Sequence, residues 1–167
     1  MYSVNGIGIG AGYVRAIGPK VTKRLDVGDP VLLSFDHCTK CTQCRSGHPA
    51  YCSAFSPLNV AGEPSTFQGA GGAVAGQFFG QSSFANLSAV KEASVVNVKG
   101  LIKGEDELKL FAPMGCGFQT GAGTVVNLAK ATREDSVVVM GLGGVGLAAV
   151  MVSQQRRKKP RCRKACR

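Results

Sequence analysis

Four cysteines within fifteen residues are the part of this sequence with the clearest chemistry. They follow the pattern C-x2-C-x2-C-x7-C, and the residues are Cys38, Cys41, Cys44 and Cys52. Thiolates bind zinc in a tetrahedron at about 2.3 Å, and a Cys-x2-Cys spacing lets one tight turn present two thiolates to the same ion. The segment between the last two cysteines contains Gly47 and Pro49 and is long enough to return over the metal. The spacing therefore predicts a structural zinc site in a loop over residues 37–52.

Other chemistries also use clustered cysteines, so a disulfide pair, an iron–sulfur cluster and unrelated free thiols stay open as alternatives. The chain has seven cysteines, an odd number, and it begins Met-Tyr-Ser-Val-Asn-Gly without the pattern of a secretory signal. Disulfides persist mainly in oxidising compartments. We therefore expect a cytoplasmic protein and favour zinc. His37 and His48 flank or lie inside the loop, where a solvated or turn-stabilising role is favoured over metal ligation.

The formal net charge of +10 is concentrated in a basic tail over residues 153–167. Eight basic residues follow Gln155 and no acid follows Asp135, so the rest of the chain carries only +2. The tail could attract polyanions, but it has no aromatic residue for base stacking, so we expect disorder and no specific nucleic-acid binding. Residues 137–152 are sixteen uncharged, mostly apolar residues, whereas a membrane-spanning helix needs about 20. We expect no membrane insertion.

The first part of the chain has the pattern of an all-β domain. Residues 12–17 and 31–35 are short runs rich in β-branched or aromatic residues, and Gly, Pro and Asp bound them, as is typical of strands. A Gly/Ala/Ser stretch over residues 62–76 has no period and is expected to be a flexible connection. Strand-like patterning resumes after it, at residues 78–79, 84–87 and 93–98.

The second part has the pattern of a strand, a glycine turn and a helix. Residues 105–130 carry early acids and apolar residues at helical spacing, interrupted by a glycine cluster at 115–123. Residues 135–140 then predict a buried strand, which is followed at once by the glycine-rich turn 141–146 and an apolar helical start at 147–152. This order is typical of the beginning of a dinucleotide-binding domain.

Three glycines of this turn have separate tasks in such a domain. Gly141 would make the tight turn, Gly143 would let the backbone approach the pyrophosphate, and Gly146 would let helix and strand pack closely. The amino terminus of the helix offers unpaired N–H groups to the phosphates. A glycine-rich turn in a packed core is the alternative, and no acidic residue follows Gly146 to bind the ribose hydroxyls.

These motifs together resemble the zinc-containing medium-chain alcohol dehydrogenases, with the aryl-alcohol (benzyl alcohol) branch as the nearest likeness. The resemblance spans roughly residues 6–152. The motifs that carry it are Gly10-Ala-Gly-Tyr-Val14, Val27-Gly-Asp29, Val31-Leu-Leu-Ser-Phe35, the four-cysteine loop ending Gly47-His-Pro-Ala-Tyr-Cys52, Phe79-Gly-Gln-Ser-Ser-Phe84, Gly115-Cys-Gly-Phe-Gln-Thr-Gly-Ala-Gly123 and the turn 141–146.

This resemblance implies a mixed β and α/β fold. Residues 1–115 would form a partial GroES-like β domain that bears the zinc loop 37–52, and residues 116–152 would begin a Rossmann NAD-binding domain. The implied reaction is hydride transfer between an alcohol, aryl or benzylic, and NAD, with zinc acting as a Lewis acid on the alcohol oxygen. Small-molecule alcohols or aldehydes are the implied substrates, and a homo-oligomer is compatible with the family.

The resemblance also assigns site residues by motif position. Cys116 corresponds to a catalytic zinc ligand, and Thr120 and Val145 correspond to contacts on the nicotinamide side. The pyrophosphate turn corresponds to Gly141, Gly143 and Gly146.

The sequence departs from the family pattern at the other catalytic ligands. Gly8-Ile9 stands where family members carry a His-Glu pair, and the family's earlier cysteine ligand would precede Met1. A catalytic zinc usually has three protein ligands and an open position, and only Cys116 is assigned here. We therefore expect a chain that is truncated at both ends relative to the family and impaired in activity. The alternative is a noncatalytic, zinc-stabilised module that binds another subunit.

Overall fold

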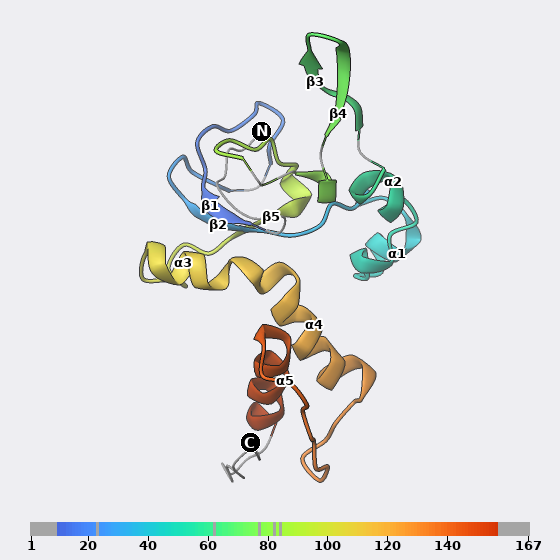
Figure 1. The fold of residues 1–167 in the computed structure, drawn as a ribbon, viewed down its shortest axis with the longest axis vertical. Helices are drawn as coiled ribbons and strands as arrows, with labels where there is room; N and C mark the ends of the chain where they lie inside the picture. The colour runs from blue at the N-terminus through green and yellow to red at the C-terminus, as the bar shows by residue number, and fades with distance from the viewer. Residues whose placement is uncertain are drawn as a thin grey trace. The chain divides into compact units, whose positions relative to one another are not determined.

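The computed structural model describes residues 10–22, 24–61, 63–76, 78–81, 83 and 85–156, with the backbone alone for residues 63–68 and 74–76. The chain divides between Gly115 and Cys116 into two compact units (Figure 1). Unit 1 contains the sheet and the cysteine loop, and unit 2 is helical.

Unit 1 is built on a three-stranded antiparallel sheet in the order β1-β2-β5. The strands are β1 (Ala11–Tyr13), β2 (Pro30–Leu33) and β5 (Val95–Asn97). In the central strand, Leu32 pairs with Ala11 on one side and with Val96 on the other. The strands expected at 12–17, 31–35 and 93–98 are thus present in shorter form. After β1, Val14 continues the contact in irregular form, because its N–H donates to the carbonyl of Asp29 and its own carbonyl accepts from Gly28.

The sheet buries a separate apolar cluster on each face, because neighbouring side chains on a strand point to opposite sides. Val31 and Leu33 pack into one cluster, whose other members are Val14, Leu25, Val90 and Val95. Leu32 points the other way and packs with Ala11, Val98 and Leu108. Leu108 lies on helix α3 (Glu105–Phe111), which therefore covers the second face (Figure 1). A 3-10 turn, η4 (Ala112–Gly115), ends the unit.

Residues 63–76 form a β-hairpin, so the expected flexible connection over this stretch is wrong. Strands β3 (Glu63–Gly69) and β4 (Gly72–Gly76) pair in antiparallel fashion, with Gly69 opposite Gly72. Only two residues, Ala70 and Gly71, remain for the turn, and Gly72 has a φ of +112° that side-chain-bearing residues rarely adopt. Backbone pairing across a glycine-rich turn needs no alternation of side chains, which is why the sequence pattern did not indicate it.

The strand expected at residues 78–79 is also wrong. A 3-10 turn with a kink at Phe79, η2 (Phe78–Gly80), occupies this position. Phe79 and Gly80 have left-handed φ angles of 52° and 71°, which do not occur in a regular strand. Phe84, where the next strand was expected to begin, lies outside the described residues; Ala85 makes a single β-bridge, and residues 86–87 form a bend. A third 3-10 turn, η3 (Glu92–Ser94), leads into β5.

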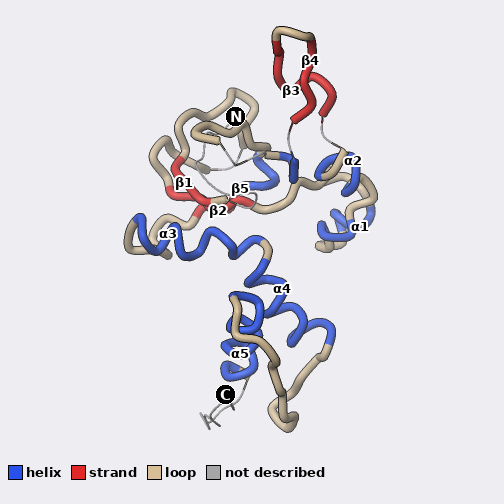
Figure 2. Tube along the Cα trace, in the orientation of Figure 1, coloured by secondary structure: helices blue, strands red, loops and turns tan. Residues whose placement is uncertain are grey.

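Unit 2 consists of helix α4 (Gly117–Gly123), one π-helical turn η5 (Thr124–Leu128) and helix α5 (Gly144–Gln155). Helices α4 and α5 pack against each other (Figure 2). A side chain at Gly121 would overlap the carbonyl oxygen of Val145, so the two helices can approach this closely only because Gly121 has none. The small core contains Val125, Ala131 and Ala149, with Val137, Val139 and Val152 packed against it.

Residues 135–140 form no strand in the described part of the chain, in contrast to the sequence prediction. Burial nevertheless alternates as it would in a strand, since Val137 and Val139 are half-buried while Val138 is 85% and Met140 95% exposed. A strand also needs a neighbouring backbone to pair with, and the described residues supply none beside this segment. Residues 135–140 therefore have the hydrophobic pattern of a strand without backbone pairing to a second strand in the described part of the chain.

Helix α5 runs three residues beyond the boundary expected at 152. The hydroxyl of Ser153 donates to the carbonyl of Ala149 at 2.7 Å, and the guanidinium of Arg156 donates to the carbonyl of Ala131 at 2.9 Å, so the start of the basic tail is held on unit 2. The rest of the tail, for which disorder was expected, lies outside the described residues. None of the helices in the described ranges has the length and apolar character needed to cross a membrane.

Candidate metal centre

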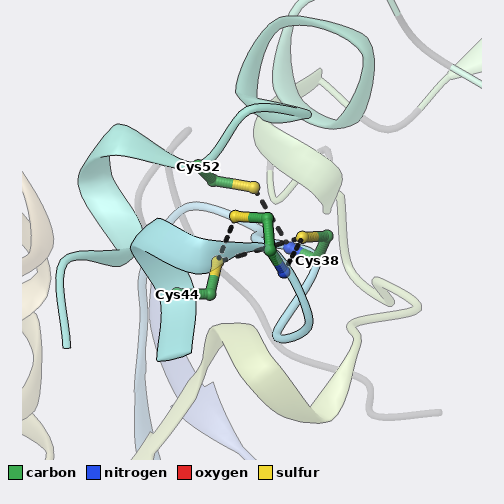
Figure 3. A group of neighbouring side chains, drawn as sticks. Cys38, Cys44 and Cys52 are labelled. Atoms are coloured by element: carbon green, nitrogen blue, oxygen red, sulfur yellow. Dashed lines mark hydrogen bonds between the residues drawn. The ribbon is translucent and has the colours of Figure 1, made fainter. Parts of the chain in front are cut away.

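The four cysteines of the predicted zinc loop meet at one place in unit 1 (Figure 3). All four Sγ atoms lie within 4.8 Å of one another; the Cys41 and Cys44 sulfurs are 3.5 Å apart and those of Cys38 and Cys44 are 3.9 Å apart. Sulfurs that surround zinc tetrahedrally at about 2.3 Å have edges of roughly 3.8 Å. The described thiols are therefore gathered closely enough for one ion to bind all four, and two of their distances are close to that tetrahedral edge.

Short helical turns position these thiols. Cys41 precedes helix α1 (Thr42–Arg45) and Cys44 lies within it, while Cys52 follows a 3-10 turn, η1 (Pro49–Tyr51). The reversal between the two turns uses Gly47, which has a φ of +82°. We call residues 38–52 the cysteine lobe.

Backbone amides of the lobe point at its sulfurs. The N–H of Cys41 donates to Sγ of Cys38 at 3.3 Å, and the N–H of Cys38 donates to Sγ of Cys52 at 3.4 Å. Amide donors of this kind stabilise negative charge on sulfur, as thiolate ligands require. The lobe is thus arranged to hold charged ligands.

The thiols differ in how readily they lose a proton. The N–H of Cys44 lowers the pKa of Cys41 to about 5, and the N–H of Lys40 lowers the pKa of Cys38. Burial, followed by the contacts with the Cys41 and Cys52 sulfurs, raises the pKa of Cys44 to about 12. Since zinc binds thiolates, a divalent cation would compensate this accumulated charge and displace the proton from Cys44.

Two residues that the sequence analysis did not identify hold the base of the cysteine lobe. Asp36 and Asn59 are 1% and 0% exposed, respectively, and the Asn59 side chain bonds to both the N–H and the carbonyl of Asp36. Asn59 is the last residue of helix α2 (Phe55–Asn59). Neither residue belongs to a ligand pattern, and the only sequence signal was their position on either side of the four cysteines.

The predicted catalytic ligand Cys116 is exposed and stands at the start of α4 in unit 2. Its carbonyl accepts hydrogen bonds from both the N–H and the hydroxyl of Thr120, each at 2.8 Å. Among the described residues, the four lobe cysteines are the only group of three or more His, Cys, Asp and Glu close enough to share an ion, and Cys116 is not among them. His37 and His48 are not part of that group either.

The residues assigned to the cofactor lie at the turn before α5 and in its first turn. Gly141 has a φ of +94°, Gly143 precedes the helix with open space where a side chain would be, and a side chain at Gly146 would overlap the carbonyl oxygen of Gly141. Val145 is 46% exposed. The open side of Gly143 and the close packing at Gly146 are the two conditions that a dinucleotide turn requires of these positions.

Comparison with known proteins points in the same direction as this geometry. Residues 7–100 match the family model described as "Alcohol dehydrogenase GroES-like domain". A geraniol dehydrogenase of Castellaniella defragrans is 40% identical over 148 residues, which are 85% of this chain and 38% of the relative. A probable alcohol dehydrogenase of a Pseudomonas species is 36% identical, over 88% of this chain and 47% of the relative. The chain thus spans less than half the length of these relatives.

Two solved structures match the chain with similar sequence identity and over similar lengths. The chain superposes with a TM-score of 0.75 and 38% identity on an alcohol dehydrogenase zinc-binding domain protein from Burkholderia ambifaria, covering 93% of this chain and 42% of that one. It superposes with a TM-score of 0.73 and 41% identity on the benzyl alcohol dehydrogenase of Acinetobacter calcoaceticus, covering 89% and 39%.

Proposed function

The chain belongs to the zinc-containing medium-chain alcohol dehydrogenase family with its GroES-like domain, and on that premise we propose that it serves NAD-dependent alcohol oxidation with a structural zinc in the cysteine lobe. The observation that carries the proposal is the convergence of four thiols, all within 4.8 Å of one another, inside the matched domain.

The zinc in the lobe has a structural role in this proposal. Four protein ligands close the coordination sphere, whereas a catalytic zinc keeps one position for water or substrate. Cys38, Cys41, Cys44 and Cys52 fill all four positions. The ion would therefore fix the shape of the lobe, and the chemistry would take place elsewhere.

A catalytic zinc is not supported by the described residues. Cys116 fits one ligand position of the family, but it is exposed and belongs to no group of three or more possible ligands in the described ranges. A catalytic site needs about three protein ligands. Cys116 alone does not complete a catalytic zinc site, and we propose that the 167-residue chain by itself is impaired in turnover.

The turn before α5 supports a dinucleotide cofactor, for which we propose NAD. When bound, NAD accepts the hydride of the alcohol carbon. Gly141 turns the chain, and the open face of Gly143 leaves room for a pyrophosphate beside the unpaired N–H groups of the first helical turn. Thr120 and Val145 are exposed and would lie toward the nicotinamide in this proposal.

The names of two similar proteins support a proposal for the substrate class. Benzyl alcohol and geraniol both carry the hydroxyl on a carbon attached to an aromatic ring or a double bond. We therefore propose an aryl or similarly activated primary alcohol, or the matching aldehyde. The noncatalytic binding module is not favoured, because the similar proteins are named as alcohol dehydrogenases.

Native mass spectrometry of the 17.3 kDa chain tests the zinc assignment. One bound zinc is expected. Two zinc ions would mean that Cys116 finds further ligands, and zero would overturn the lobe assignment. A parallel assay follows NADH formation with benzyl alcohol, and turnover with only one zinc bound would contradict the proposed impairment.

A further inference from the structure

We propose that Asn59 is a positioning residue for the metal site, because its buried amide closes the base of the cysteine lobe before an ion binds. The proposal rests on the zinc assignment above. It adds a function for a residue that is not a ligand and that carries no charge.

The Asn59 amide joins the two chain segments that enter and leave the lobe. Its Oδ1 accepts from the N–H of Asp36 at 2.8 Å, and its Nδ2 donates at 2.9 Å to the carbonyls of Asp36 and Phe55. Asp36 stands two residues before Cys38, and Asn59 stands seven residues after Cys52. One fully buried side chain therefore spans the base of the loop that supplies all four thiols.

The Asp36 end of this contact is fixed to the rest of unit 1. The Nζ of Lys91 lies 2.8 Å from Oδ2 of Asp36, and the N–H of His37 donates to Oδ1 at 2.8 Å. Beside them, the rings of Phe35 and Phe55 are 5.5 Å apart at their centroids and add apolar contact at the same place. Asn59 thus ties helix α2 to a position that the sheet already holds.

This arrangement changes the free energy of metal binding. Bringing the ends of a loop together costs conformational entropy, and gathering several thiolates costs charge repulsion. The hydrogen bonds at the base order the ends of the loop before zinc binds. Less of the zinc-binding free energy is then lost in ordering the loop. Without Asn59, the buried N–H and carbonyl of Asp36 would also lose their partner.

The experiment compares zinc affinity of the full chain and of Asn59→Leu by competition with a chromophoric chelator. Groups that hydrogen-bond the ligands themselves typically contribute about 10–100-fold to metal affinity; Asn59 acts through the Asp36 backbone instead, and we expect a loss at the lower end of that range, about tenfold. Saturating cobalt gives a second measurement: its absorption bands in the variant should match those of the wild type, since the four thiolates remain.

Two controls separate positioning from general stability. Asn97→Leu removes another asparagine that makes hydrogen bonds outside the lobe. The Asn97 amide donates to the carboxylate of Asp29 and accepts from the N–H of Lys99. Val14→Ala opens the buried core of the sheet. Both should keep zinc affinity within about threefold of wild type even where they lower the unfolding midpoint. If Asn59→Leu does not fold, the zinc affinity of Asn59→Ser is measured instead and judged by the same expected loss.

The outcomes distinguish the two proposals. Wild-type affinity in the Asn59 variant, or an equal loss in Val14→Ala, overturns the positioning role while the zinc assignment stands. A wild-type chain that takes up neither zinc nor cobalt overturns the zinc assignment itself.

Discussion

The backbone N–H of Cys38 donates a hydrogen bond to the sulfur of Cys52, 3.4 Å away, and so joins the first and last cysteines of the lobe. Cys52 is also the most buried of the four, at 5% exposed. The chain's own backbone therefore positions the fourth ligand, although it is separated from the others by the longest spacing.

Replacing Cys52 by serine should remove zinc from the lobe. A serine hydroxyl is a neutral and hard ligand, and three thiolates alone leave the ion open to water. Since the binding free energy of a structural zinc is also folding free energy, Cys52→Ser should melt at a lower temperature as well. Zinc content from native mass spectrometry and a thermal scan check this prediction.

Cys116→Ser is the matched control, because it replaces an exposed cysteine that belongs to no ligand group in the described residues. It should keep one zinc per chain and the wild-type melting temperature. Full zinc occupancy in Cys52→Ser would contradict the four-thiolate site.

Gly80→Ala should destabilise unit 1 more than Gly100→Ala does. Both glycines have left-handed φ angles, +71° and +79°, so each alanine costs about 1–2 kcal/mol in backbone strain. The new methyl group at residue 80 would in addition lie 2.5 Å from Cβ of Asp36, whereas the one at residue 100 meets nothing within 4 Å. Overpacking of this kind costs about 1–3 kcal/mol further.

Urea unfolding of the two glycine variants measures this difference. Because the two substitutions share the backbone strain, their difference isolates the contact with Asp36. Equal free energies of unfolding would mean that Asp36 moves away without cost and that the base of the cysteine lobe is less rigid than its hydrogen bonds indicate.

The sequence predicted those features that repeat a short pattern. The four cysteines were identifiable because ligand spacing is itself the pattern, and the central strand was identifiable from the apolar run Val31–Leu33. The hairpin over residues 63–76 has no such alternation. Its pairing depends on the turn between Gly69 and Gly72 and on the positive φ of Gly72, which composition does not reveal.

Long-range contacts account for the other misses. Asn59 is a single polar residue in the short helix α2, and its importance comes from Asp36, 23 positions earlier. Residues 135–140 carry a strand-like hydrophobic pattern, yet a strand forms only where a neighbouring backbone accepts its hydrogen bonds. The local sequence sets the tendency of a segment to form a strand or a contact, and the segment it meets elsewhere in the chain decides whether that structure forms.

Gly146→Ala should destabilise unit 2, while Gly143→Ala should leave its stability within about 0.5 kcal/mol of wild type. A methyl group at residue 146 would overlap the carbonyl oxygen of Gly141, whereas residue 143 has open space around it. The φ of Gly143 is −72°, which alanine adopts without strain. Hydrogen exchange of the α5 amides reports the stability of this unit separately from that of unit 1.

The two glycine variants also separate packing from cofactor binding. If NAD lies over the turn, Gly143→Ala should weaken NADH binding, measured by fluorescence titration, in a protein of normal stability. Destabilisation by Gly143→Ala equal to that of Gly146→Ala would contradict this division of roles.

Asp29 should make the chain sensitive to acid. Its carboxylate is 2.7 Å from Nζ of Lys99 and accepts from the N–H of Asp26 and the amide of Asn97, both at 3.0 Å. The Lys99 ammonium, followed by the Asp26 amide, holds the pKa of Asp29 below its usual value of 3.8. In the unfolded chain the pKa returns to about 3.9.

The sign of the effect follows because the pKa of Asp29 is lower in the folded chain than in the unfolded chain. Below about pH 4 the unfolded chain takes up a proton at Asp29 before the folded chain does, so the free energy of unfolding falls as the pH falls through the folded pKa. Above about pH 4 the stabilisation is fully present. Asp29→Asn should therefore be less stable than wild type at pH 7 and lose less stability on acidification.

Urea unfolding at pH 7 and at several values below pH 4 measures the two slopes. Asp106→Asn serves as the control, because it removes an exposed carboxylate in the first turn of α3, outside the Asp29–Lys99–Asn97 network. Its acid slope should follow wild type. Parallel acid slopes for wild type and Asp29→Asn would mean that the carboxylate gains nothing from Lys99, and that the loop between β1 and β2 is held by its backbone hydrogen bonds alone.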